Sequence, residues 1–299
     1  MNVHEKVKTE SGIPLLNKID AKSPALHAIG RDGLIVKEGT KFGTMSFRAD
    51  TSVIMPPAGL VPGTDYAVIL RDDVLVAVAM SSGSLEQPVT LGGFHFAPGG
   101  NATARSGGDE VPAINPCSLW DIDFRPACPD PRGMALVQKP GGQFWCDIYL
   151  TGKNCADDGT SRFGVTIADG DDRPAGFKKF DYATALAVMT YHGKGLLSFE
   201  EFAAAAIGVT EKTANRRDPE TTGLDAARTS RFGLMQATGN LWVWGHDGDP
   251  DEPRASVFGG SWLSGGDAGS RCAHVAAHWP GNSDDYLGAR GRCDHLQPV

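Results

Sequence analysis

The sequence has no long apolar segment. No hydrophobic run among its 299 residues approaches the roughly 18 that a membrane-spanning helix requires. The first ten residues are polar and of mixed charge, without the apolar centre of a signal peptide. We therefore expect no membrane span and a protein that is cytoplasmic or associated with a virion, with export by another route left open.

Basic clusters are missing as well. The chain carries 28 Lys and Arg residues against 36 Asp and Glu residues, for a net charge of −8. A surface that binds nucleic acid gathers Lys and Arg on one face or along one stripe, and the sequence shows no such cluster. We therefore do not expect nucleic acid as a partner, and we attribute the acidic balance mainly to solubility.

The familiar catalytic motifs are also absent. There is no Gly-x-x-x-x-Gly-Lys-Ser/Thr loop, no Gly-x-Gly-x-x-Gly, no His-Glu-x-x-His and no Gly-x-Ser-x-Gly. No Cys-x-x-Cys pair suits zinc, so we expect reduced, buried thiols at all six cysteines. These are Cys117, Cys128, Cys146, Cys155, Cys272 and Cys293.

Two weaker metal signals remain. His274 and His278 are four residues apart, which would place two ligands on one helix face, but the Gly and Pro residues nearby argue against a helix. The acidic run 246–252 resembles a calcium loop, yet Glu252 stands where such a loop needs glycine, and Phe258 stands where it needs a bidentate Glu. We predict solvent-facing polar residues and no cofactor, with a structural calcium ion left open.

The residues that are present divide the chain into two unlike parts. Residues 66–70 and 74–79 are apolar, β-branched runs bounded by turn signals, so the first part is predicted to be β-rich. The glycine-rich segment 97–108 is typical of a flexible linker or long loop, and we place a domain boundary near residue 112. All six cysteines follow this boundary.

The second part mixes strands and helices. Runs 133–137 and 144–150 are predicted strands, and residues 181–191 are a predicted helix. A second helix is predicted after a Ser-x-x-Glu capping box, formed by Ser198 and Glu201, with Gly208 as its C-cap. Strands, then two helices, then short strands with long loops indicate an α+β fold.

Four short motifs follow one another in the last third of the chain. They are Trp242-Val-Trp244, Phe258-Gly-Gly-Ser-Trp262, Gly269-Ser-Arg-Cys-Ala273 and Gly288-Ala-Arg-Gly291. Their order resembles the formylglycine-generating-enzyme branch of the C-type lectin fold, over roughly residues 113–296. The resemblance implies a C-type-lectin-like domain over 113–299. It does not cover residues 1–112, the β-rich N-terminal domain or extension, for which we suggest an anchoring role.

This branch contains enzymes and binding proteins. The enzymes use a cysteine pair after the Gly-Gly-Ser-aromatic run, and here Ser264 and Gly269 stand in those places. Serine does not replace a redox-active or copper-binding thiolate, so we predict no enzyme activity. A metal-dependent oxidase-type enzyme of the same superfamily stays as the alternative, and a structural module of a virion or assembly as a second one.

The binding proteins match better. Residues 223–239 and the ending from Gly288 to Leu296 resemble the variable proteins of diversity-generating retroelements, including phage tropism determinants. That resemblance implies a variable region at about 255–296, in which error-prone copying changes outward-pointing residues while the others hold the fold. The expected partner is a protein or cell-surface ligand of unknown identity, and an oligomer is left open.

The resemblance and a period-two alternation after Gly260 together indicate which residues bind the ligand. The predicted ligand-binding residues are Ser261, Leu263, Gly265, Asp267, His274, Ala276, His278, Asn282, Asp284, Tyr286 and Leu287. Ala277 is the alternative to His278. We single out Tyr286, because tyrosine offers a large contact area at low entropic cost.

The scaffold of this site is predicted to be Trp262, Arg271, Trp279 and Arg290. We favour Trp262 as a fixed core residue over a ligand contact. Arg271 and Arg290 could bind an anion, but we favour buried arginines that bridge loop carbonyls and carboxylates. Cys293, Asp294 and His295 resemble a catalytic cluster, and we interpret them as a fixed terminal motif.

Overall fold

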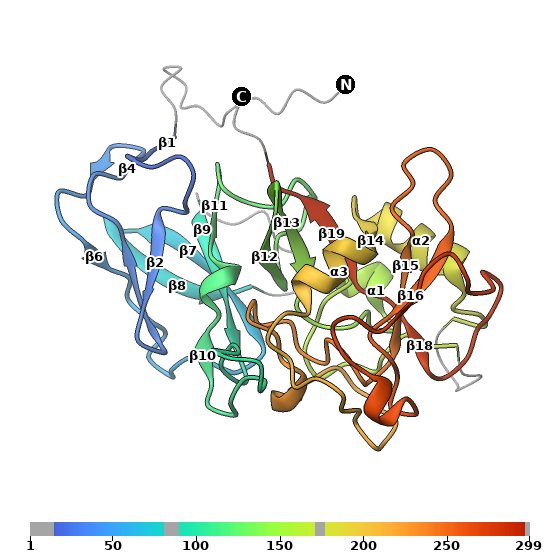
Figure 1. The fold of residues 1–299 in the computed structure, drawn as a ribbon. Coiled ribbons are helices and arrows are strands. Elements are labelled where there is room, and N and C mark those ends of the chain that lie inside the picture. The colour runs from blue at the N-terminus through green and yellow to red at the C-terminus, as the bar shows by residue number, and fades with distance from the viewer. Residues whose placement is uncertain (1–14, 81–89, 171–176, 297–299) are drawn as a thin grey trace.

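The computed structural model describes residues 15–80, 90–170 and 177–296 (Figure 1). The polar N-terminal segment considered above lies outside these ranges. Within them, none of the helices is long and apolar enough to cross a membrane. Blue to cyan strands gather at one side of the molecule in Figure 1, and the yellow to red elements gather at the other.

The first part of the chain forms three small antiparallel sheets. Two have three strands each, β1 (Leu16–Asn17), β4 (Lys41–Phe42) and β5 (Met45–Ser46), and β2 (Leu26–Ile29), β3 (Gly33–Val36) and β6 (Thr51–Ser52). The third runs β10-β9-β7-β8, with β11 also on β9. Its strands are β7 (Thr64–Arg71), β8 (Val74–Ala79), β9 (Thr90–Ala97), β10 (Ala113–Ile114) and β11 (Trp120–Asp121). Apolar side chains from these strands share one hydrophobic core.

The predicted strands 66–70 and 74–79 are confirmed as β7 and β8. They form a hairpin in which Arg71 pairs with Val74. Asp72 and Asp73, the two residues between them, both have positive φ, 50° and 60°. A two-residue turn of this kind matches the right-handed twist of the strands, and aspartate is among the residues that tolerate it.

The second part is built on one eight-stranded mixed sheet in the order β12-β13-β19-β14-β15-β16-β17, with β18 also on β15. The C-terminal strand β19 lies inside the sheet, between β13 and β14. The strands are β12 (Met134–Lys139), β13 (Gly142–Asp147), β14 (Gly195–Ser198), β15 (Trp242–His246), β16 (Ala255–Phe258), β17 (Ala273–His274), β18 (Leu287–Gly288) and β19 (Gly291–Asp294). The runs predicted at 133–137 and 144–150 are therefore strands, but β13 stops at Asp147.

The helices are α1 (Cys155–Asp158), α2 (Tyr182–Tyr191) and α3 (Phe199–Ala205), and three 3₁₀ turns are η1 (Pro116–Ser118), η2 (Ala226–Arg228) and η3 (Gly265–Asp267). Both α2 and α3 pack against β14. Helix α2 confirms the helix predicted at 181–191, with the Asp181 side chain accepting from the Thr184 N–H at its start. Few helices beside a mixed sheet confirm the α+β class.

The capping box of α3 is confirmed. The Glu201 N–H donates to Ser198 Oγ at 3.3 Å, and the Ser198 N–H donates to Glu201 Oε2 at 3.1 Å. The prediction of Gly208 as the C-cap is wrong, because α3 ends at Ala205 and Ala206 is its cap. The chain passes through 3₁₀-like turns after Ala206 and reaches Gly208 two residues later.

The glycine-rich segment 97–108 is an ordered loop that joins the two parts of the chain. The Gly107 N–H donates to Gly208 O at 2.9 Å, and the Ala102 N–H donates to Ser230 O at 3.1 Å. The flexible-linker interpretation is therefore wrong, because these backbone groups are bonded to the second part. The boundary near residue 112 stays a prediction, although β10 and β11 follow it and still pair with β9.

Candidate functional site

The turn after strand β16 depends on two consecutive glycines. Gly259 and Gly260 have positive φ values of 92° and 78°. A Cβ atom on Gly260 would lie 2.9 Å from both Cα and Cβ of Ala268, so a side chain there would be strained and too close. These glycines turn the chain out of the sheet and into the loops of the predicted variable region, orange to red in Figure 1.

Residues 261–268 form a compact turn. The Ser261 N–H donates to Ser264 Oγ at 3.0 Å, and η3 follows directly. The predicted period-two alternation is therefore wrong here, because local hydrogen bonds close a turn where an extended chain was expected. Ser261 is only 1% exposed, which corrects the prediction that it contacts a ligand.

Three of the predicted ligand residues in this turn do face solvent. Leu263 is 61% exposed, and Gly265 and Asp267 are exposed beside it. Trp262 is half-buried and packs on an apolar cluster, as a scaffold residue would. This cluster consists of Leu150, Ile167, Leu241 and Val243.

The two histidines of the predicted site lie against aromatic residues of strand β15. The His274 ring centroid is 4.9 Å from that of Trp242, and the His278 centroid is 5.2 Å from that of Trp244. The two imidazole centroids are 6.5 Å apart, and Asn282 Nδ2 lies 3.4 Å from His278 Nε2. Burial, followed by the charge of His274, lowers the pKa of His278. Among the residues that the structure describes, no three His, Cys, Asp or Glu side chains form a group that could hold a metal ion.

Tyr286 and Asp284 form a pair. The Tyr286 hydroxyl donates to Asp284 Oδ2 at 2.8 Å, and this hydrogen bond raises the pKa of Tyr286 to about 12. Both side chains are half-buried. Leu287, in contrast, is buried, because it belongs to β18 and its backbone pairs with Trp242 of β15. The prediction that Leu287 contacts a ligand is wrong.

Ala276 is exposed. Ala277 is exposed and His278 is half-buried, so both are accessible and the choice between them as the ligand residue stays open. The Ala276 N–H donates to Ser256 Oγ at 2.8 Å, which ties this loop to strand β16. The predicted residues thus form two groups, the turn 263–267 and the loop 274–286. Val275, which is 42% exposed, lies in the second group and was missed because it falls between two predicted positions.

Arg290 is a buried structural arginine, as predicted. Its guanidinium donates to the carbonyl oxygens of Asp147 at 2.7 Å, Ile148 at 2.5 Å and Met235 at 2.6 Å. Only 1% of the residue is exposed, and burial lowers the pKa of its guanidinium. Arg290 therefore holds the start of β19 to the end of β13 and to the chain before β15.

Two other scaffold predictions are wrong. Arg271 is exposed, because it follows a turn whose neighbouring residue, Ser270, is the one that bonds inward, to Glu211. Trp279 is 72% exposed, and its indole belongs to none of the hydrophobic clusters that the described residues form. Both side chains therefore belong to the candidate surface.

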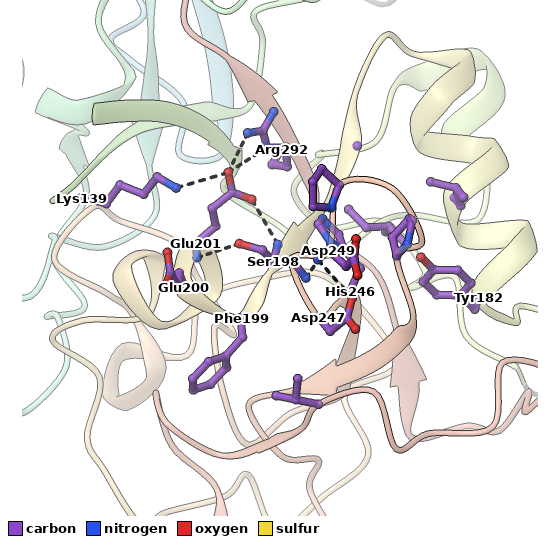
Figure 2. A pocket seen from close by; sticks show the side chains of 17 residues that line it. Lys139, Tyr182, Ser198, Phe199, Glu200, Glu201, His246, Asp247, Asp249 and Arg292 are labelled. Carbon is purple, nitrogen blue, oxygen red and sulfur yellow. Dashed lines mark hydrogen bonds and ion pairs between the residues drawn. The ribbon is translucent and has the colours of Figure 1, made fainter. Parts of the chain in front are cut away.

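A groove of about 700 Å³ opens between α2, α3 and the loop after β15 (Figure 2). Glu201 lines the groove and accepts from the Arg292 guanidinium at 2.6 Å, with Lys139 Nζ at 3.8 Å. Burial opposes the ionisation of Glu201, but the bonds and charge of Arg292 outweigh it and lower the pKa. Since these charges are paired, the groove presents no uncompensated group from this network.

In the acidic loop of residues 247–252, two of the carboxylates accept hydrogen bonds from backbone N–H groups of the loop and of Arg254. Asp247 Oδ1 accepts from the N–H groups of Arg254 and Asp249, and Asp249 Oδ1 accepts from those of Asp251 and Glu252. This bonding supports the interpretation of a solvated loop that is closed by its side chains.

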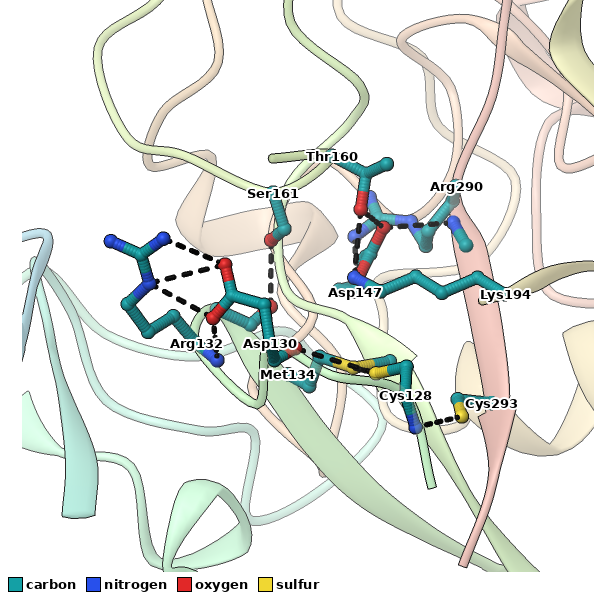
Figure 3. A network of polar contacts seen from close by, with 12 residues as sticks. Cys128, Asp130, Arg132, Met134, Asp147, Thr160, Ser161, Lys194, Arg290 and Cys293 are labelled. Carbon is teal, nitrogen blue, oxygen red and sulfur yellow. Dashed lines mark hydrogen bonds and ion pairs between the residues drawn. The ribbon is translucent and has the colours of Figure 1, made fainter. Parts of the chain in front are cut away.

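A buried polar network lies beside the sheet and has the residue types of an active site (Figure 3). Asp147 binds Lys194 Nζ at 2.6 Å, the Thr160 hydroxyl at 2.6 Å and the Gly291 N–H at 3.0 Å. Lys194 is almost fully buried, and the attraction of Asp147 outweighs burial to raise its pKa. These contacts connect the end of β13 to the start of β19, to Lys194 directly before β14 and to the loop that carries Thr160, so we interpret the network as a structural connection between these segments.

The terminal motif has the same structural character. His295 Nδ1 accepts from Trp145 Nε1 at 2.9 Å, and Cys293 Sγ accepts from the Cys128 N–H at 3.0 Å. All six cysteines are free, four of them buried and two, Cys117 and Cys272, half-buried. The Cys293–His295 segment is therefore engaged within the protein.

Comparisons with known proteins agree along nearly the whole chain. The family described as "Mtd second domain" matches residues 24–121. The "Tail fiber receptor-binding protein" of Bordetella phage BPP-1 is 40% identical, over 98% of this chain and 86% of that protein. Solved structures titled "Major Tropism Determinant" U1 and P3c variants are 37% and 38% identical, with TM-scores of 0.83 over 96% of this chain and 90% of theirs. This structural match confirms the predicted C-type-lectin-like fold.

Proposed function

Because the chain belongs to the major tropism determinant family, we propose that it is a non-enzymatic, virion-associated receptor-binding protein. It displays a diversified surface on a C-type-lectin scaffold and is encoded by a diversity-generating retroelement. The ligand is a component of a cell surface, in keeping with the receptor-binding name of its relative from Bordetella phage BPP-1.

One observation carries this proposal: side chains of unrelated chemistry are accessible on loops whose backbone is held by buried groups. Leu263, Asp267 and His274 are exposed, whereas Arg290 and the Gly259-Gly260 turn behind them are buried. Replacing an exposed loop side chain costs little stability, since the core contacts are unchanged. The exposed loop positions can therefore carry many different side chains while the fold stays the same.

The place of Ser264 supports a non-enzymatic role. This residue stands where the related enzymes carry the first cysteine, and its hydroxyl accepts from the Ser261 N–H. The second position is Gly269, which has no side chain. The pair thus offers a turn-closing hydroxyl and no thiolate, and the chemistry of those enzymes needs thiolates.

The proposal is tested by deep sequencing of the gene segment that encodes residues 255–296 across a growing population. We expect substitutions at exposed or half-buried positions, with Trp262 and Arg290 unchanged. The positions expected to vary are Leu263, Gly265, Asp267, His274, Asn282, Asp284 and Tyr286. A near-copy of the segment that differs at Asn codons, next to a reverse transcriptase gene, would support the same conclusion. A uniform segment without such a copy would overturn the diversification part of the proposal.

A binding assay tests receptor recognition separately. Purified wild-type protein is incubated with host cells and with cells stripped of surface protein and polysaccharide. We expect retention on intact cells that is lost when Leu263 and Tyr286 are both replaced by alanine. Equal retention of wild-type and doubly substituted protein would contradict a receptor site at these loops.

A further inference from the structure

Two arginines from distant parts of the chain line two adjoining hollows next to the predicted variable turn, residues 261–268. Adjoining hollows of about 400 Å³ and 470 Å³ share four lining residues. These four residues, which we call the arginine pocket, are Arg105, Glu211, Ser270 and Arg271. Arg105 comes from the glycine-rich loop 97–108, and Arg271 comes from the segment that follows the variable turn.

Both guanidinium groups are available to a ligand. Arg105 and Arg271 are exposed, and in the described part of the chain neither forms a hydrogen bond or ion pair. Glu211, the carboxylate that lines both hollows, is already engaged, because it accepts from the Ser270 N–H at 3.0 Å and from the Ser270 hydroxyl at 2.5 Å. Glu211 is therefore held toward Ser270.

The backbones that carry the two arginines are fixed. The Gly259 N–H donates to Cys272 O at 2.8 Å and the Gly269 N–H to Gly259 O at 3.1 Å, which ties the chain around Arg271 to the double-glycine turn. On the other side, the Gly107 N–H donates to Gly208 O at 2.9 Å, close to Arg105. A ligand therefore orders two side chains without ordering the backbone, which lowers the entropic cost of binding.

The charges around the two arginines nearly balance. Lys212 lines one hollow and Lys139 lines the other, although Lys139 Nζ also lies 3.8 Å from Glu201 Oε1. The acidic residues there are Glu200, Glu211 and Asp267. Because Glu211 is held toward Ser270, the two exposed guanidinium groups are the charges that the hollow offers to an anion, in a chain with a net charge of −8.

We propose that the arginine pocket binds an oxyanion, a phosphate or carboxylate group carried by the receptor. The planar guanidinium donates two parallel hydrogen bonds to either group, a geometry that lysine does not offer. That the anion belongs to a receptor rests on the proposed function, whereas anion binding as such does not. Since Asp267 and Gly266 line the same hollow, the pocket supplies an anchor and the variable turn beside it selects among ligands.

The test is a calorimetric or NMR titration of the full-length protein with inorganic phosphate and, separately, with acetate. We expect saturable binding of at least one probe, with a dissociation constant of roughly millimolar order for so few contacts. Arg105→Ala and Arg271→Ala should each weaken binding about five- to tenfold, since each removes charge-assisted hydrogen bonds. Tighter binding of phosphate would identify a phosphate source on the receptor, and tighter binding of acetate a carboxylate source.

Two further variants make the result specific. Arg254→Ala removes an exposed arginine that pairs with Asp247 outside the pocket, and it should leave binding unchanged. Asp267→Asn removes a negative charge from a residue that lines one of the two hollows, and it should tighten anion binding by roughly two- to threefold. Unchanged thermal unfolding of all variants would show that the differences arise in the pocket and not from loss of the fold.

The inference is overturned if neither probe binds saturably, or if the double variant Arg105→Ala/Arg271→Ala binds as well as wild type. These titrations do not depend on whether the gene segment varies. If the gene segment is uniform but the pocket binds an anion, only the diversification proposal is overturned. If the gene segment varies but no anion binds, only this inference is overturned.

Discussion

At the scale of single residues, two arginines nineteen positions apart in the C-terminal segment have opposite environments. Arg290 is enclosed and donates to three backbone carbonyls, whereas Arg271 is exposed beside a hollow. Sequence motifs alone placed both in the scaffold. Because one arginine is buried and the other is exposed, the two can be compared to measure how much a buried arginine contributes to the free energy of unfolding.

Replacing Arg290 with alanine should lower the free energy of unfolding by about 3 kcal/mol or more, because it leaves buried carbonyl groups without donors. Guanidinium-induced unfolding monitored by circular dichroism measures this. Arg271→Ala is the control and should stay within about 0.5 kcal/mol of wild type. Equal losses in the two variants would contradict the assigned roles.

The two tryptophans of the predicted scaffold form a second matched pair. Trp262→Ala should lower stability by roughly 2–3 kcal/mol, because it empties space beside a buried apolar cluster. Trp279→Ala should change stability by no more than about 0.5 kcal/mol, since its indole is mostly in solvent. Thermal unfolding of both variants measures these changes. A large loss of stability in Trp279→Ala would show that Trp279 is a scaffold residue after all.

At the scale of elements, α3 shows how a short helix is fixed at its start. Its capping box satisfies two backbone N–H groups, and Glu201 reaches beyond the helix to Arg292 of β19. One carboxylate therefore caps the helix and joins it to the sheet. This double use is visible only when the strand and the helix are seen together (Figure 2).

Ser198→Ala should lower stability by about 1 kcal/mol, the usual contribution of an N-cap side chain. Glu201→Gln should lower it by a similar or larger amount, because it weakens the bonds to both the backbone and Arg292. Glu200→Gln is the control within the same helical turn, since Glu200 is exposed. Chemical unfolding of the three variants would refute this account if Glu200→Gln were as costly as Glu201→Gln.

At the scale of the whole molecule, we expect carboxylates that are held by arginines to determine how stability falls in acid; one of them, Glu201, is buried and the other, Asp130, is half-buried. Burial alone would raise the pKa of Asp130, but bonds and charge from Arg132 and Arg162 hold it well below the ordinary value of 3.8. Glu201 is lowered from 4.5 in the same way by Arg292. In the unfolded chain both groups return to ordinary pKa values.

Because the folded-state pKa values lie below the unfolded ones, the unfolded chain binds more protons as the pH falls. The free energy of unfolding should therefore be steady above about pH 5 and should fall as the pH drops through about 4.5 to 3. Urea unfolding at a series of pH values measures this. Asp130→Asn should be less stable at neutral pH and should show a shallower acid decline. An unchanged slope would exclude Asp130 as a contributor.

The sequence by itself determined the features that depend on near neighbours. The hairpin of β7 and β8, helix α2 and the capping box of α3 each rest on a few consecutive residues, and each motif that resembles the family is itself a short run. A turn closes on the residues beside it, and a cap bonds to the next turn of its own helix, so local chemistry is sufficient.

Only the tertiary structure decided which side chains of the predicted variable region face solvent. Ser261 and Leu287 are buried because Asn240 and β15 pass beside them, and Arg271 and Trp279 are exposed because no element covers them within the described chain. The arginine pocket likewise requires the glycine-rich loop to pack beside the variable turn. Exposure is a property of what surrounds a residue, and these surroundings come from segments far away in the sequence, which no local pattern records.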